Sequence, residues 1–115
     1  MNITIRTLQR FDACQSQQDL FRRLFGNGGK VTVEKLRRGA REGLNVYWVR
    51  NYLMNGAQRD IYDRVAQRIY ELRNEAVYYR KKPMGYLEAD RAANEARALA
   101  VAVAFLKTGV DIPLS

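Results

Sequence analysis

The sequence predicts an all-α protein in which three short helices are followed by a long antiparallel helix pair. Apolar residues recur at intervals of three and four along most of the chain, glycine-rich and Asn-Gly turns separate these segments, and alanine is concentrated in the last one. With 115 residues, 47% of them hydrophobic, the chain is expected to form one domain. We divide it into a basic lobe (1–56) and a helical hairpin (57–109).

The first predicted helix begins at Asp12 and ends in the glycine-rich stretch at 26–29. The ten residues before it contain too few apolar positions to choose between a strand and one helical turn. Asp12 is followed three residues later by a glutamine, which is the spacing of a capping box. Cys14, Phe21 and Phe25 share the apolar face, so Cys14 is expected to be a small buried residue.

The next two predicted helices are short and separated by tight turns. Thr32 is a good N-cap for the second, which Gly43 ends. Asn45 is expected to cap the third, which contains Trp48 and ends before the Asn-Gly pair at 55–56.

The predicted hairpin consists of a helix from residue 57 to about 82 and an alanine-rich helix over 86–107. The first would be about 39 Å long at ~1.5 Å per residue. Alanine allows another helix to approach closely, so we expect antiparallel packing of the two. The predicted core takes large apolar residues from every helix: Phe21, Phe25, Leu36, Trp48, Val49, Leu53, Ile61, Val65, Ile69, Leu72, Leu99, Val103 and Leu106.

The charge of the chain is unevenly distributed. It has 20 Lys and Arg against 12 Asp and Glu, a net charge of +8. Residues 1–56 contain 10 basic and 4 acidic residues, whereas residues 57–115 contain 10 and 8. A basic lobe attracts polyanions, so the expected partner is a protein or nucleoprotein complex with an acidic surface, or DNA or RNA.

The residue inventory argues against catalysis. The chain has no histidine and one cysteine, which excludes His-based general bases, Ser–His and Cys–His pairs and the common zinc sites. The glycines at 26–29 lack the Lys-Ser or Lys-Thr ending of a phosphate-binding loop. We therefore expect no catalytic residue, cofactor or metal. The longest apolar run, 98–106, is too short to span a bilayer, so we expect a cytoplasmic protein without membrane contact.

Two segments are candidate binding surfaces. Residues 33–53 could form a helix-turn-helix corner, in which some side chains face bases and others face phosphates. Tyr47, Arg50 and Asn51 would face bases, and Lys35, Arg37, Arg38 and Arg41 would face phosphates. The alternative, which we favour, is a packing corner that happens to be basic.

The second segment alternates aromatic and cationic residues at the end of the long helix: Tyr78, Tyr79, Arg80, Lys81 and Lys82. Such residues can stack on unpaired bases or anchor a protein interface. Alternatively, the cations only compensate the helix dipole while the tyrosines pack on the alanine helix.

Residues 3–80 also resemble a group of small proteins from bacteriophages and bacterial mobile elements. The shared pattern comprises Ala13-Cys14, Gln17, Phe21, Phe25-Gly26, Val31-Thr32, Ala40, Gly43-Leu44, Trp48 and Leu53, followed by alanine–tyrosine units such as 57–62. Small non-enzymatic phage proteins often bind a host machine and block it. The resemblance therefore implies an accessory protein that inhibits a host defence or nucleic-acid-processing complex, an anti-CRISPR-like inhibitor being one instance. The alternatives are a basic nucleic-acid-binding module and a structural or assembly component of a phage. The latter predicts a defined oligomer, and the long helix with its alanine-rich partner makes self-association plausible.

Overall fold

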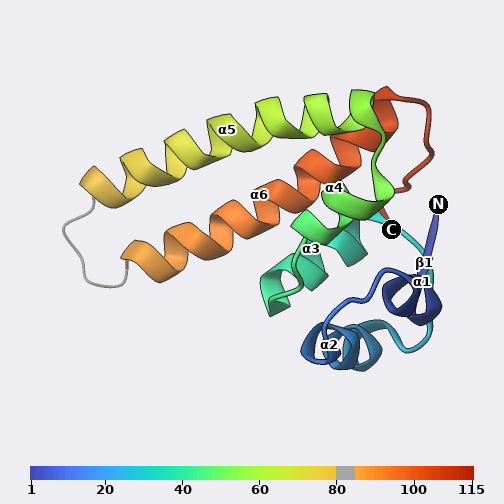
Figure 1. Cartoon of the computed structure of the whole chain (residues 1–115). Coiled ribbons are helices and arrows are strands. Elements are labelled where there is room, and N and C mark those ends of the chain that lie inside the picture. The colour runs from blue at the N-terminus through green and yellow to red at the C-terminus, as the bar shows by residue number, and fades with distance from the viewer. Residues whose placement is uncertain (80–84) are drawn as a thin grey trace.

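The protein is mostly helical, with a small two-stranded sheet near its N-terminus (Figure 1). The structure is a computed structural model that describes residues 1–79 and 85–115, and among these the side chains outside 76–79 and 85–88. The described elements are β1 (Asn2–Thr4), α1 (Ile5–Arg10), α2 (Gln15–Phe25), β2 (Gly28–Lys30), α3 (Val33–Glu42), α4 (Tyr47–Leu53), α5 (Gly56–Tyr79) and α6 (Gly85–Lys107).

The first ten residues form a strand and a helix, and β1 pairs antiparallel with β2. Thr4 and Thr7 close a capping box at the start of α1. The segment expected to be only a turn therefore also contains β2. Gly28 is required there: its φ is +91°, and a Cβ would collide with the Ile3 carbonyl oxygen and lie 2.9 Å from the Phe21 ring.

Helix α2 starts later than the capping-box spacing suggested. Its N-cap is Cys14, which makes no side-chain capping bond, while Asp12 has a φ of +55° in the turn after α1. The turn forms because the backbone N–H of Ala13 donates to the carbonyl of Leu8 at 3.0 Å. Cys14 is exposed rather than buried, so that expectation is wrong: the turn places the residue before the helix, outside its apolar face.

Helix α3 has the boundaries that its sequence predicted. The Thr32 hydroxyl accepts the Lys35 N–H at 3.1 Å, and Gly43 ends the helix with a φ of +104°. The end of the chain completes the first turn. The N–H groups of Val33 and Glu34 donate to the carbonyls of Pro113 and Leu114 at 2.9 and 3.0 Å.

The starts of α4 and α5 are set by asparagine. The Asn45 side chain accepts the Tyr47 N–H at 3.0 Å, although Val46 is the N-cap residue of α4. Before α5, the side chains of Asn55 and Gln58 each accept the other's backbone N–H at 2.9 Å. This reciprocal capping explains why a helix begins at an Asn-Gly pair that otherwise signals a break.

Helices α5 and α6 run antiparallel side by side, and α3 packs on α6 as well (Figure 1). Polar contacts join α5 and α6 near both ends: Gln58 Nε2 donates to Thr108 Oγ1 at 3.0 Å, and Arg73 pairs with Asp90 at 2.8 Å. The buried residues of α6 are mostly small: Ala93, Ala98, Ala100, Val101, Ala102, Ala104 and Phe105.

Four residues predicted to lie in the core are exposed instead: Leu72, Leu99, Val103 and Leu106. For the three that lie on α6, the physical reason is that α6 has a helix on either side. Both neighbours approach along its small residues, and this leaves the line through Leu99 and Val103 toward solvent.

Tyr62 is the largest fully buried side chain and lies on α5, with 0% of its surface exposed. Its ring packs edge-on against Tyr47, with 6.0 Å between the ring centroids. Its hydroxyl is buried and has no hydrogen-bond partner among the described residues. Burial raises the pKa of Tyr62 to about 12, because the phenolate would lose its hydration.

Candidate functional site

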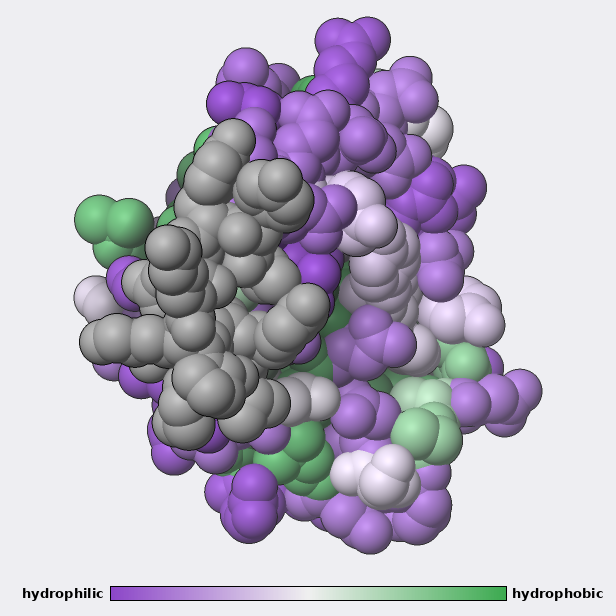
Figure 2. All heavy atoms as spheres, turned by 90° about the vertical axis from the view of Figure 1, so that its left-hand side faces the viewer, coloured by the Kyte–Doolittle hydropathy of each residue, from purple (hydrophilic) through white to green (hydrophobic). Residues whose placement is uncertain are grey.

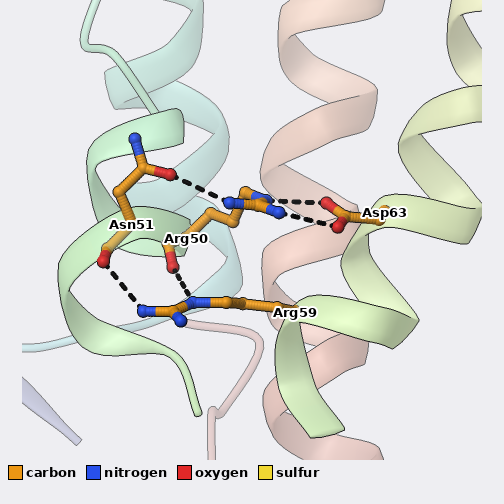
Figure 3. A network of polar contacts seen from close by, with 4 residues as sticks. All are labelled: Arg50, Asn51, Arg59 and Asp63. Atoms are coloured by element: carbon orange, nitrogen blue, oxygen red, sulfur yellow. Dashed lines mark hydrogen bonds and ion pairs between the residues drawn. The ribbon is translucent and has the colours of Figure 1, made fainter. Parts of the chain in front are cut away.

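The helix-turn-helix corner is present as α3 and α4, but its proposed base-reading side chain is engaged within the protein (Figure 3). Arg50 forms a bidentate pair with Asp63 of α5, with both N–O distances 2.7 Å. A third nitrogen of Arg50 donates to the Asn51 side-chain oxygen at 3.0 Å. All three guanidinium nitrogens therefore have acceptors inside the chain.

Arg59 of α5 also contacts α4, next to the Arg50–Asp63 pair (Figure 3). It donates to the backbone carbonyls of Arg50 and Asn51, at 3.1 and 2.9 Å, at the end of α4. The hydrogen bonds from Arg50 hold the pKa of Asp63 below its usual range, and the pKa of Arg50 is raised in turn. The geometry therefore uses Arg50 and Asn51 to attach α4 to α5.

Two of the four α3 cations serve a similar purpose. Arg37 and Arg41 both pair with Glu95 of α6, at 3.5 and 3.0 Å. The hydrogen bond from Arg41 is the main reason that the pKa of Glu95 is lowered. Reversing the charge of either arginine would place two carboxylates together, so neither is a clean probe of partner binding.

The other two α3 cations differ. Lys35 donates to the Lys30 carbonyl at 3.0 Å and has no carboxylate partner among the described residues. Arg38 is exposed and makes no ion pair with the described residues. The second candidate segment falls largely beyond the structure: residues 80–82 and the side chains of Tyr78 and Tyr79 lie outside what is described.

The lobe carries further exposed cations that the sequence did not single out. Besides Lys35 and Arg38, the following side chains have no carboxylate within ion-pair distance among the described residues: Arg6, Arg10, Arg22, Arg23 and Lys30. The sequence gives no local signal for these cations, because they are dispersed along the chain and no dense basic motif contains Arg22, Arg23 or Lys30. A signal was available in the composition, since the four acidic residues of 1–56 are too few to neutralise ten cations.

The lobe also contains a hollow of about 260 Å³ between the N-terminal elements and α3–α4. Most of its lining is apolar and includes Leu8, Phe21, Phe25, Leu36, Trp48 and Tyr52. Lys30 and Lys35 also belong to the lining. An apolar hollow with cations beside it can receive an apolar group that carries or neighbours negative charge.

Aromatic packing forms one wall of this hollow. Phe11, Trp48 and Tyr52 pack on one another, with ring centroids 5.5–5.9 Å apart. The indole Nε1 of Trp48 is buried and has no acceptor among the described residues. A buried donor without a partner is uncommon in folded proteins.

Cys14 also lines the hollow and is exposed. Its sulfur lies 3.3 Å from the Ser16 hydroxyl, and this hydrogen bond is the main cause that lowers the pKa of the thiol. Within the described ranges, no group of three or more His, Cys, Asp or Glu side chains could hold a metal ion.

The face of the molecule shown in Figure 2 is mostly hydrophilic outside the undescribed residues, with apolar residues in small separate areas. No helix in the described part of the chain is both long enough and apolar enough to cross a membrane. Comparison with protein-family models, with curated proteins and with solved structures gave no match.

Proposed function

We propose that this protein is a non-catalytic phage or mobile-element accessory protein that binds and inhibits a host defence or nucleic-acid-processing complex. An anti-CRISPR-like inhibitor is one instance. The proposal rests above all on the apolar hollow of the lobe, whose lining includes Lys30 and Lys35, two cations without a carboxylate partner among the described residues. We assign the contact with the partner to this surface.

The cations of the lobe act at long range and select for acidic partners. Exposed cations without carboxylate partners attract an acidic surface over about one Debye length, ~8 Å at physiological salt. They raise the association rate and disfavour basic partners. In the lobe, Arg22, Arg23 and Arg38 are exposed cations of this kind.

The hollow favours a protein partner over bare duplex DNA. Base reading from α4 would require Arg50 to leave both Asp63 and Asn51. A protein, by contrast, can place one apolar side chain in a hollow of about 260 Å³ and acidic side chains around it. Anchors of this kind carry much of the free energy of protein interfaces.

The partner can be sought by affinity capture from nuclease-treated host lysate. We expect a stoichiometric protein to remain bound after nuclease treatment, and the purified protein to inhibit that partner's activity. Loss of all captured protein after nuclease treatment, together with salt-sensitive binding of purified DNA, would instead support a nucleic-acid-binding module.

A matched pair of variants then tests the assigned surface. Arg22→Glu/Arg38→Glu reverses two lobe cations, and Arg64→Glu/Arg91→Glu makes the same charge change on exposed hairpin residues. We expect the lobe variant to lose partner binding and inhibition while the hairpin variant retains both. Equal losses in the two variants would show that only net charge matters and would reject the lobe surface.

A further inference from the structure

Helix α6 leaves a single line of side chains toward solvent in its central part. From Ala93 to Phe105, the exposed residues are Leu99 and Val103, with 41% and 36% of their surfaces accessible. Leu106 continues the line at 48%. Toward the other end, Ala92 is exposed and Ala96 is half-buried. We call these five residues the α6 seam.

The seam has the spacing of a helix–helix contact. Its members follow one another at intervals of four, three, four and three residues, the alternation found in coiled coils. Every member is apolar, although the seam faces solvent. A helix that is apolar all round is normally buried. Neither α3 nor α5 covers the seam, so we expect another helix to pack on it.

Helix α5 also has exposed apolar surface, on its side away from the lobe. Asp63 and Arg59 contact α4, which fixes the side of α5 that faces the lobe. Leu72, which is 47% exposed, lies about 180° from Asp63 around the helix at ~100° per residue. The half-buried Ile61 and Val65 lie on that same side.

Electrostatic repulsion between two copies of this chain is expected to be weaker at this face than at the lobe. The chain has a net charge of +8, so two copies repel wherever their cations meet. Residues 1–56 contribute +6 of this excess, whereas residues 57–115 contribute +2 and the seam itself contributes none. The hairpin face is therefore where two copies can approach with the least repulsion.

The order of side-chain sizes along the seam also fits a second copy. Two small residues, Ala96 and Ala92, lie three and seven residues before Leu99, and two larger ones, Val103 and Leu106, lie four and seven residues after it. We propose that two chains associate through this face, with their α6 helices antiparallel and Leu99 at the twofold axis. Ala92 of one chain then lies opposite Leu106 of the other, so that small residues meet large ones.

Sedimentation equilibrium of the full chain tests the association. We expect the mass of a dimer, in which each chain contributes 13.3 kDa. Leu99→Glu is expected to weaken dimerisation on the order of 100-fold or more, because it places two carboxylates together at the axis. Leu99 is already exposed, so the helical circular dichroism signal should be unchanged.

Leu114→Glu is the matched control, because Leu114 is 78% exposed and lies outside the hairpin. It should leave the dimer intact. A monomer at all concentrations up to ~200 µM, well above the micromolar range of specific complexes, would overturn the proposal. A dimer that Leu99→Glu does not weaken, or that Leu114→Glu weakens equally, would overturn it as well.

Cysteine cross-linking tests the register in a Cys14→Ser background, which removes the chain's only thiol. Leu99→Cys should form an interchain disulfide under mild oxidation, since the two copies meet at the axis. Leu106→Cys should not cross-link to itself, because its neighbour in the partner is Ala92. The reverse result would reject the antiparallel register.

Discussion

In the lobe, α2, α3 and α4 meet around aromatic side chains and leave a hollow of about 260 Å³, whereas α5 and α6 meet across alanines that are almost completely buried. The lobe has ten basic and four acidic residues, whereas residues 57–115 have ten and eight. This difference separates two tasks. Close packing of small residues gives the hairpin a firm scaffold, and loose packing leaves the lobe an apolar space that another molecule can fill.

The ion pairs connect these two regions. Those between described residues all use hairpin carboxylates: Asp63, Glu71, Asp90 and Glu95. Asp63 and Glu95 bind three arginines that belong to the lobe. The hairpin thus neutralises the arginines that attach the lobe to it, and the remaining lobe cations keep their charge available at the surface.

The largest expected effect compares one substitution in the two regions. Ala98 on α6 is 0% exposed and Ala40 on α3 is 2% exposed, but Ala40 lines the hollow. Ala98→Leu should destabilise the protein by ~3 kcal/mol, because close-packed helices must separate to admit the side chain. Ala40→Leu should cost less than ~1 kcal/mol or stabilise, since space is available.

Urea denaturation of both variants measures this difference. Similar losses for the two alanines would show that the hollow closes in solution, and the contrast between lobe and hairpin would then be wrong.

A smaller effect is expected from Tyr62 at alkaline pH. Its pKa is raised to about 12 from an ordinary value of 10.0. The unfolded chain therefore loses this proton first, so the stabilising contribution is complete below pH 10 and declines as the pH rises toward 12. At ~1.4 kcal/mol per pKa unit, the loss is at most ~2.7 kcal/mol.

Tyr62→Phe should remove this part of the alkaline destabilisation. It should cost little stability at pH 7, because the hydroxyl has no hydrogen-bond partner among the described residues. Tyr52→Phe is the control, since Tyr52 is 51% exposed. Parallel alkaline denaturation curves for Tyr62→Phe and the original chain would contradict the burial of this ring.

The smallest effect concerns the pair that joins the two regions. Arg50 and Asp63 are partly exposed, so a double-mutant cycle with Arg50→Gln and Asp63→Asn should give a coupling energy of ~0.5–1 kcal/mol. The pKa of Asp63 is lowered, so this stabilisation is present above the ordinary pKa and is lost as the pH falls through the lowered value.

The hairpin pair Arg68–Glu71, separated by three residues on one helix, should couple more weakly, at a few tenths of a kcal/mol. If it couples as strongly as Arg50–Asp63, the bidentate bond between lobe and hairpin has no special role.

Local signals predicted the helices well where a cap and a glycine bracket them. Thr32 and Gly43 delimit α3 as expected, because both act through bonds within a few residues of the helix. The pairing of β1 with β2 was missed, since the partners are separated in sequence and their strands are only three residues long. Periodicity placed Leu99 in the core because it identifies an apolar face without saying which neighbours cover it.

The binding surface was harder to predict for a related reason. Net charge located the excess of cations in the lobe, but Arg37, Arg41 and Arg50 find carboxylates on α5 and α6, distant in sequence. Only the tertiary structure separates these structural arginines from exposed cations such as Arg22 and Arg38. The hollow likewise depends on how α2 sits against α3 and α4, which no local pattern specifies.

The contact between the end of the chain and α3 has a consequence for the order of folding. The carbonyls of Pro113 and Leu114 lie about 80 residues along the chain from the Val33 and Glu34 N–H groups that they accept. Closing so long a loop is entropically unfavourable, and such distant contacts slow folding. During synthesis, the first turn of α3 must remain incompletely bonded until residues 113 and 114 have left the ribosome. The lobe is therefore synthesised first, but the hydrogen bonds of its helix α3 are completed only after the hairpin has been synthesised.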